Sequence, residues 1–99
     1  MRMDDHIDTP VLSVTEIGSS TVRMRIVQVT GDGWRELESL ERPVRIGREV
    51  FTSRRIRFDS VALLSRILDD YAQVMREYGV MRSRTVATTA LREAENRDY

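Results

Sequence analysis

The sequence predicts a small α/β domain with three antiparallel strands, a crossover helix, a parallel fourth strand and the start of a second helix. Two observations lead to this expectation. Residues 11–42 contain three strand-like segments separated by glycine-containing turns, and residues 61–78 carry apolar side chains at helical spacing. A crossover helix returns the chain to a parallel strand, so the fourth strand should lie beside the first, with the third strand at the opposite edge.

Each of the three predicted strands has its own pattern. Residues 11–17 are rich in β-branched side chains. Residues 21–29 alternate apolar side chains with arginines, which is typical of an antiparallel strand with one face toward water. A hairpin turn at residues 31–33 precedes residues 34–42, whose charges indicate an edge strand.

The crossover helix has the clearest pattern in the chain. We expect Asp59 and Ser60 to cap its start and Gly79 to end it in a left-handed conformation. Residues 44–58 before it show no clear period and are expected to form a linker. The apolar side of the helix comprises Val61, Leu64, Ile67, Leu68, Tyr71, Val74, Met75 and Tyr78.

The composition excludes several kinds of chemistry. The chain has no cysteine, hence no disulfide and no thiolate nucleophile or metal ligand. All 16 basic residues are arginine, whose planar guanidinium groups suit bidentate phosphate contacts. The formal net charge is zero, so no overall field favours nucleic acid or a membrane surface. Without a signal peptide or a membrane-length apolar run, a cytoplasmic location is expected.

Residues 1–10 are expected to form a flexible leader, and residues 11–99 the domain itself. The leader contains the single histidine, His6, among three aspartates. A metal site there is the alternative to a solvated tail. Asp69 and Asp70 are interpreted as the polar face of the long helix rather than as a paired-carboxylate site.

Two segments are candidates for anion binding. The turn at residues 18–21 is built from small residues, which let an anion approach the backbone N–H groups and short hydroxyls. A strand at residues 83–88 leads into a helix start at residues 89–95, and free N–H groups at a helix start also attract anions. Alone, the first segment is more simply interpreted as an ordinary turn, and the second as a threonine cap followed by a solvated Arg92.

Together, in this order and spacing, the two segments resemble the opening of the exopolyphosphatase and guanosine pentaphosphatase (Ppx/GppA) family. Members begin with a strand ending in Asp-Ile-Gly-Ser-Asn-Ser-x-Arg and continue, further along, with a strand and helix start like Ala-Thr-Ser-Ala-x-Arg-x-Ala-x-Asn. Residues 43–47 also resemble the family segment that precedes the crossover helix. The resemblance spans residues 11–99, and the matching positions are Ile17, Gly18, Ser19, Arg23, Ala87, Thr88, Ala90, Arg92, Ala94 and Asn96.

The resemblance implies a fold and a reaction. The family belongs to the actin/hexokinase/Hsp70-like superfamily, with a ribonuclease-H-like sheet in each half, in agreement with the strand order expected above. The implied reaction is hydrolysis of the terminal phosphate of inorganic polyphosphate or guanosine pentaphosphate, with Mg²⁺. The phosphate-binding positions that the resemblance assigns are Gly18, Ser19, Ser20 and Thr21 in the first turn, Arg23 beside the phosphate chain, and Arg92 and Asn96 after the fourth strand.

The resemblance also assigns Glu16 as the metal-facing carboxylate, with two departures from the family pattern. Glu16 replaces an aspartate, which would displace a metal or its water by roughly an ångström. Ser20 replaces an asparagine, and Thr21 replaces the serine after it. The family's catalytic glutamate and second glycine-rich loop would lie beyond residue 99, so the resemblance assigns no catalytic residue to this chain. We therefore expect one wall of a cleft, without hydrolysis by these residues alone.

Two alternatives differ from this hypothesis in kind. A non-catalytic module of the same fold would bind polyphosphate or a guanosine alarmone without turnover, or serve only as an interaction domain. A homodimer would pair the otherwise bare edge of the fourth strand between two copies. Arg54, Arg55 and Arg57 form a local basic cluster, which is interpreted as solvated linker rather than as a phosphate site.

Overall fold

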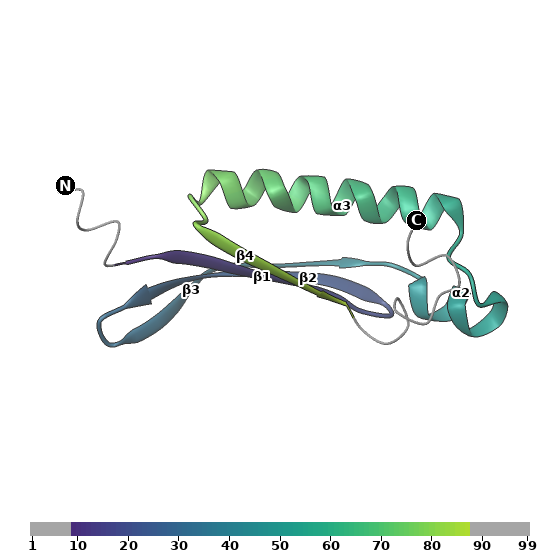
Figure 1. The fold of residues 1–99 in the computed structure, drawn as a ribbon, viewed down its shortest axis with the longest axis horizontal. Helices are drawn as coiled ribbons and strands as arrows, with labels where there is room; N and C mark the ends of the chain where they lie inside the picture. Colours follow the sequence, from purple (N-terminus) through teal and green to yellow (C-terminus); the bar gives the residue numbers. More distant parts are fainter. Residues whose placement is uncertain (1–8, 88–99) are drawn as a thin grey trace.

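The computed structural model describes residues 9–87 and confirms the predicted sheet (Figure 1). The central strand β1 (Val11–Ile17) pairs antiparallel with β2 (Thr21–Thr30) and parallel with β4 (Arg82–Ala87). Strand β3 (Gly33–Pro43) pairs antiparallel with β2, so the order is β3-β2-β1-β4. The predicted helix at residues 89–95 lies outside the described residues.

One long helix, α3 (Phe58–Glu77), covers one face of the sheet (Figure 1). The alternation in β2 decides which side chains it covers, because successive residues of a strand point to opposite faces. Met24 is fully buried, while its neighbours Arg23 and Arg25 are exposed on the other face, as predicted. The buried apolar core consists of Ile17, Val22, Met24, Ile26, Val44, Ile46, Ile56, Ile67 and Tyr71.

Tyr71 joins the helix to the sheet. Its side chain is 2% exposed, and its hydroxyl donates a hydrogen bond of 2.7 Å to the backbone carbonyl of Val22. Burial raises the pKa of the Tyr71 hydroxyl, so the group is protonated and able to donate at neutral pH. The ring supplies apolar packing and the hydroxyl satisfies a buried backbone acceptor, which fixes the position of α3 over β2.

A β-bulge changes the pairing of β2 with β3. Val27 pairs with Glu36, but the next pair along the ladder is Ile26 with Glu38, so Leu37 is the extra residue. In a regular strand, Leu37 and Leu40 would point to opposite faces because they are three residues apart. The bulge brings both leucines against the core.

The segment expected to be a linker is partly helical. Residues 44–58 contain α2 (Ile46–Ser53), with Ile46 buried and Val50 packed against the core. An eight-residue helix is too short to be stable by itself, and this one depends on these contacts with the rest of the domain. The sequence pattern missed it because only Ile46 and Val50 face the core, which is too few to establish a period.

Two expectations for α3 were wrong in detail. The helix begins at Phe58 with Arg57 in the N-cap position, where no side chain of its own caps it, instead of being capped by Asp59 and Ser60. Tyr78, predicted to be core, lies just after the last turn, is 36% exposed and donates a hydrogen bond to Glu38. Gly79 does adopt the predicted left-handed conformation, with φ of 69°.

The polar side of α3 is as predicted. Asp69 and Asp70 are exposed, and Asp70 forms an ion pair of 3.1 Å with Arg42 of β3. Among the described residues, no helix is both long and apolar enough to cross a bilayer.

The Tyr71 hydrogen bond can be tested by its removal. Tyr71→Phe keeps the ring but leaves the Val22 carbonyl without this donor, so we expect a loss of about 1–2 kcal/mol in unfolding free energy. Tyr78→Phe is the matched control, and its exposed hydroxyl should contribute less than about 0.5 kcal/mol. Urea unfolding followed by circular dichroism measures both, and equal losses would contradict the assignment of Tyr71 as the link between helix and sheet.

Candidate functional site

The candidate phosphate turn lies at the end of the sheet where β1 and β4 both terminate. Ile17 of β1 pairs in parallel register with Ala87 of β4. Strands β1 and β4 therefore end side by side, and the turn at residues 18–20 begins beside the last residue of β4. Arg92 and Asn96, the predicted contacts of the second segment, lie outside the described residues.

The turn itself is closed by one internal hydrogen bond. The Gly18 N–H donates to the Thr21 carbonyl at 2.8 Å, so this N–H is not available to an anion. A Cβ at position 18 would approach the Thr21 carbonyl oxygen to 3.0 Å, which explains the glycine. Ser19 and Ser20 are exposed, and within residues 9–87 no protein group accepts a hydrogen bond from either backbone N–H.

Residues 44–47, which lead into α2, hold the turn from one side through two hydrogen bonds. The Val44 N–H donates to the Ser20 carbonyl and the Gly47 N–H donates to the Ser19 carbonyl, both at 2.9 Å. Gly47 lies in the first turn of α2, where N–H groups have no partner inside the helix. The Ser19 carbonyl supplies that partner. The two hydrogen bonds hold the carbonyls of Ser19 and Ser20 toward residues 44–47.

Arg23 stands two residues after the turn, on the face of the sheet away from α3. Its register partners are Glu16 on β1 and Glu41 on β3, so a carboxylate flanks it on either side. The Arg23 guanidinium forms an ion pair of 3.3 Å with Glu41, and the two side chains are 59% and 53% exposed. Such an exposed pair is weak, so an incoming phosphate could compete with Glu41 for Arg23.

Glu16 fits only part of a magnesium site. Its carboxylate is exposed on the same face as Arg23. Among the described residues, no three His, Cys, Asp or Glu side chains lie close enough together to hold a metal ion. Mg²⁺ usually takes one or two carboxylates and completes its shell with water and substrate phosphates, so Glu16 would suffice as one ligand of a phosphate-bound ion.

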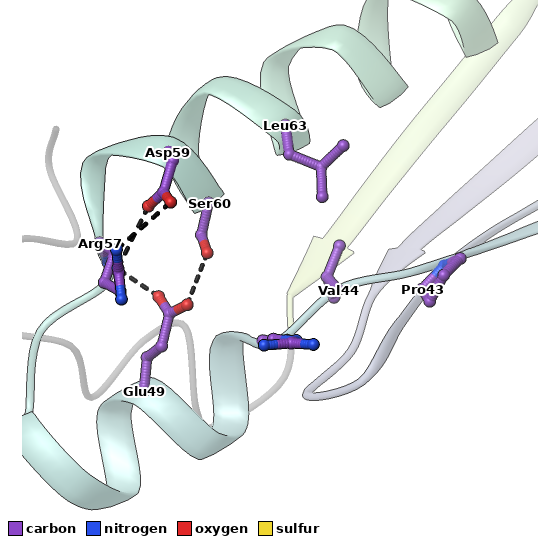
Figure 2. Close-up of a pocket in the computed structure, with 8 residues that line it drawn as sticks. Pro43, Val44, Glu49, Arg57, Asp59, Ser60 and Leu63 are labelled. Atoms are coloured by element: carbon purple, nitrogen blue, oxygen red, sulfur yellow. Dashed lines mark hydrogen bonds and ion pairs between the residues drawn. The ribbon is translucent and has the colours of Figure 1, made fainter.

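A pocket of about 650 Å³ lies between α2, the start of α3 and the chain segment after β3 (Figure 2). Its lining contains two arginines and two carboxylates, so it carries no net charge. This balance does not favour a polyanion. The lining residues are Pro43, Val44, Arg45, Glu49, Arg57, Asp59, Ser60 and Leu63.

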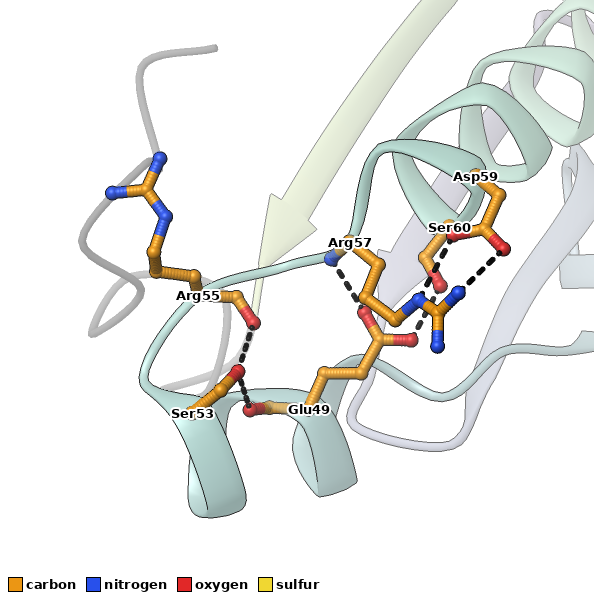
Figure 3. Close-up of polar contacts among 6 residues, drawn as sticks. All are labelled: Glu49, Ser53, Arg55, Arg57, Asp59 and Ser60. Atoms are coloured by element: carbon orange, nitrogen blue, oxygen red, sulfur yellow. Dashed lines mark hydrogen bonds and ion pairs between the residues drawn. The ribbon is translucent and has the colours of Figure 1, made fainter.

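Glu49 in this pocket has a structural role (Figure 3). Its carboxylate accepts hydrogen bonds from the Arg57 backbone N–H at 2.8 Å and from the Ser60 hydroxyl at 2.6 Å. Arg57 is the N-cap residue of α3, so a side chain from α2 caps the longer helix. A negative charge at this position also interacts favourably with the helix dipole.

The basic cluster at residues 54–57 follows α2. The Arg57 guanidinium pairs with Asp59 at 3.3 Å, and both side chains are well exposed. Arg54 closes α2 in a left-handed conformation, with φ of 61°. The side chains are solvated, as interpreted from the sequence, but they follow a helix rather than a linker.

Sequence reasoning missed three residues that shape the site. Gly47 and Val44 fell in the segment expected to be irregular, and their resemblance to the family segment at residues 43–47 was the only pointer to them. Glu41 was missed because the bulge shifts the register. A hairpin ladder continued without it would place Leu40 opposite Arg23.

Solved structures share this fold. A Ppx/GppA family member from Aquifex aeolicus superimposes with a TM-score of 0.87 and 27% identity, over 91% of this chain and 29% of that one. The chain therefore has the fold of the N-terminal half-domain of Ppx/GppA proteins. An exopolyphosphatase-like protein matches the half-domain with a TM-score of 0.84 and 27% identity, over 92% and 28% of the two chains.

A third structure supports the fold alone. An exopolyphosphatase from Cytophaga hutchinsonii has a TM-score of 0.83 at 19% identity, over 89% of the half-domain and 28% of that chain. The half-domain thus spans less than a third of the length of these structures. No family model matches the sequence, and no curated protein matches it significantly.

The role of Glu49 predicts a loss of stability on its removal. Glu49→Ala leaves the Arg57 N–H and the Ser60 hydroxyl without their acceptor, and we expect a loss of about 1–2 kcal/mol in unfolding free energy. Glu77→Ala, at the opposite end of α3, is the control and should be nearly neutral. Chemical unfolding of the two variants compares them, and a neutral Glu49→Ala would show that α3 does not need this cap.

Proposed function

We propose that this chain is the phosphate-binding half of a Ppx/GppA-like phosphatase that hydrolyses the terminal phosphate of inorganic polyphosphate or guanosine pentaphosphate. The observation that carries the proposal is the exposed turn at residues 19–20. It presents two hydroxyls, and two N–H groups without an acceptor among residues 9–87, at the shared end of β1 and β4. Backbone donors of this kind bind phosphate without bulky side chains in the way. The same turn follows Ile17 and Gly18 of the family motif.

Within this proposal the residues of the chain bind and orient the phosphate chain. Ser19 and Ser20 donate hydrogen bonds, and Arg23 leaves Glu41 to neutralise a phosphate group. We propose that Arg92 and Asn96 complete the same wall, and that Glu16 holds Mg²⁺ together with phosphate oxygens. Bound magnesium would neutralise negative charge on the phosphates.

Hydrolysis would require groups that these residues do not supply. Phosphoryl transfer to water depends on a residue that orients the water and on charge stabilisation from more than one side. We propose that a glutamate and a second loop elsewhere in the complete cytoplasmic enzyme provide them. The 99-residue chain is then expected to bind phosphate chains without turning them over.

A non-catalytic module that binds polyphosphate or a guanosine alarmone is the second candidate. The observation that favours it is Glu16, which reaches further than the aspartate of the family motif and has Arg23 as its cross-strand neighbour. A homodimer through the β4 edge is less favoured, because Arg82 and Arg84 of two copies would meet along it.

The binding proposal predicts a salt-sensitive interaction that depends on Arg23. In calorimetric titrations with medium-length polyphosphate and Mg²⁺, Arg23→Ala should weaken binding about tenfold or more, since a charge-assisted contact is lost. Arg92→Ala should act in the same direction. Arg76→Ala on α3, whose guanidinium contacts Gln73, is the control and should bind as the unmodified chain does. Absence of binding by the folded unmodified chain would refute the proposal.

The ion pair with Glu41 predicts an effect of the opposite sign. Glu41→Gln removes the carboxylate that competes with phosphate for Arg23, so polyphosphate affinity should rise by a fewfold. Glu38→Gln is the matched control on the same strand, since Glu38 contacts Tyr78 rather than Arg23. The same titration measures both, and weaker binding by Glu41→Gln would mean that Arg23 acts only while held by its partner.

A further inference from the structure

We infer that Gly47 is a positioning residue of the phosphate turn, which deepens the proposed function of that turn. Gly47 contacts the turn directly and is not itself expected to contact a ligand. Two features of its environment carry the inference: the direction that its hydrogen bond imposes on one peptide group of the turn, and the absence of space for any side chain.

The first feature is the hydrogen bond from the Gly47 N–H to the Ser19 carbonyl at 2.9 Å. The peptide group that joins Ser19 to Ser20 is planar and trans, so its C=O and N–H point in opposite directions. Because the C=O points toward α2, the Ser20 N–H points away from α2. The helix start thereby presents this N–H, which has no partner within residues 9–87, to the outside of the turn.

The second feature is the close approach of the two segments. A Cβ at position 47 would lie 2.6 Å from the Ser19 Cβ, 3.1 Å from its Oγ and 3.3 Å from its Cα. The Ser19 Cβ is attached directly to the backbone, so it cannot swing aside as the end of a long side chain would. An alanine at position 47 would therefore have to move the turn or the first turn of α2.

Helix propensity does not explain this glycine. Alanine is the more favourable residue inside a helix, and α2 is short enough for its own stability to matter. The φ angle of Gly47 is not in the left-handed region, unlike those of Gly33 and Gly79. The close approach to Ser19 explains this glycine, because an alanine could not come as near to Ser19 without a clash.

The test is a set of four variants of the 99-residue chain. Gly47→Ala introduces the clash, and Gly31→Ala is the matched control, because a Cβ there has no neighbour within 4 Å. Ser19→Gly removes the group that Gly47→Ala would strike, and the double variant combines the two. Calorimetry with sodium tripolyphosphate and Mg²⁺ gives affinity, and thermal unfolding gives stability.

We expect Gly47→Ala to bind tripolyphosphate at least tenfold more weakly than the unmodified chain, and Gly31→Ala to bind equally well. The double variant should return to the affinity of Ser19→Gly, because the 2.6 Å and 3.1 Å contacts are removed and only the 3.3 Å approach to the Cα of residue 19 remains. Unchanged binding by Gly47→Ala would overturn the inference, as would a double variant weaker than Ser19→Gly. If Gly47→Ala does not fold, the comparison of the double variant with Ser19→Gly still decides whether the inference holds.

A separate readout distinguishes this inference from the proposed function. Should the unmodified chain bind no tripolyphosphate, the phosphate-binding proposal fails, but the positioning role is still measurable without ligand. The backbone amide resonance of Ser20 should then shift in Gly47→Ala and stay in place in Gly31→Ala. An unshifted Ser20 resonance would overturn the positioning role.

Discussion

The parallel pairing of β1 with β4 is the constraint on which the rest of the structure depends. It places Ile17 beside Ala87, although the two residues are far apart in the sequence. Helix α3 makes the crossover between the hairpin strands and β4, and the burial of Ile67 and Tyr71 against the sheet holds that crossover in place. Packing of α3 on one face of the sheet therefore determines that β1 and β4 end side by side. The turn that we propose to bind phosphate follows β1 at this end.

The electrostatics around the turn are local rather than global. The chain has no net charge, and Arg23 lies between two carboxylates of neighbouring strands. This arrangement keeps a guanidinium group two residues after the turn. The two carboxylates offset its positive charge, which limits the attraction of anions that do not contact the turn itself. Recognition would then depend on the backbone donors of the turn, whose direction is set by α2, more than on long-range attraction.

The sequence allowed the sheet order and the long helix to be predicted because both rest on strong periodic patterns. Val22, Met24 and Ile26 alternate with arginines, and the apolar residues of α3 recur at helical spacing. The α2 helix and the Glu49 cap could not be predicted, because each depends on contacts between segments rather than on a local pattern. For the candidate site, the position of the turn followed from its glycine and serines, and its assignment to phosphate from the family motif. The hydrogen bonds from Val44 and Gly47 required the three-dimensional arrangement.

The bulge at Leu37 links the core of the domain to the surroundings of Arg23. A regular ladder would place Ser39 opposite the buried Met24 and Leu40 opposite the exposed Arg23. With the extra residue, Leu40 faces Met24 and Glu41 faces Arg23. A regular ladder formed with all of these residues kept would thus bring a polar residue into the core and an apolar one onto the surface, whereas loss of Leu37 itself would keep the observed partners. The irregular strand is the form in which the hydrophobic layer and the charged face are both correctly assembled.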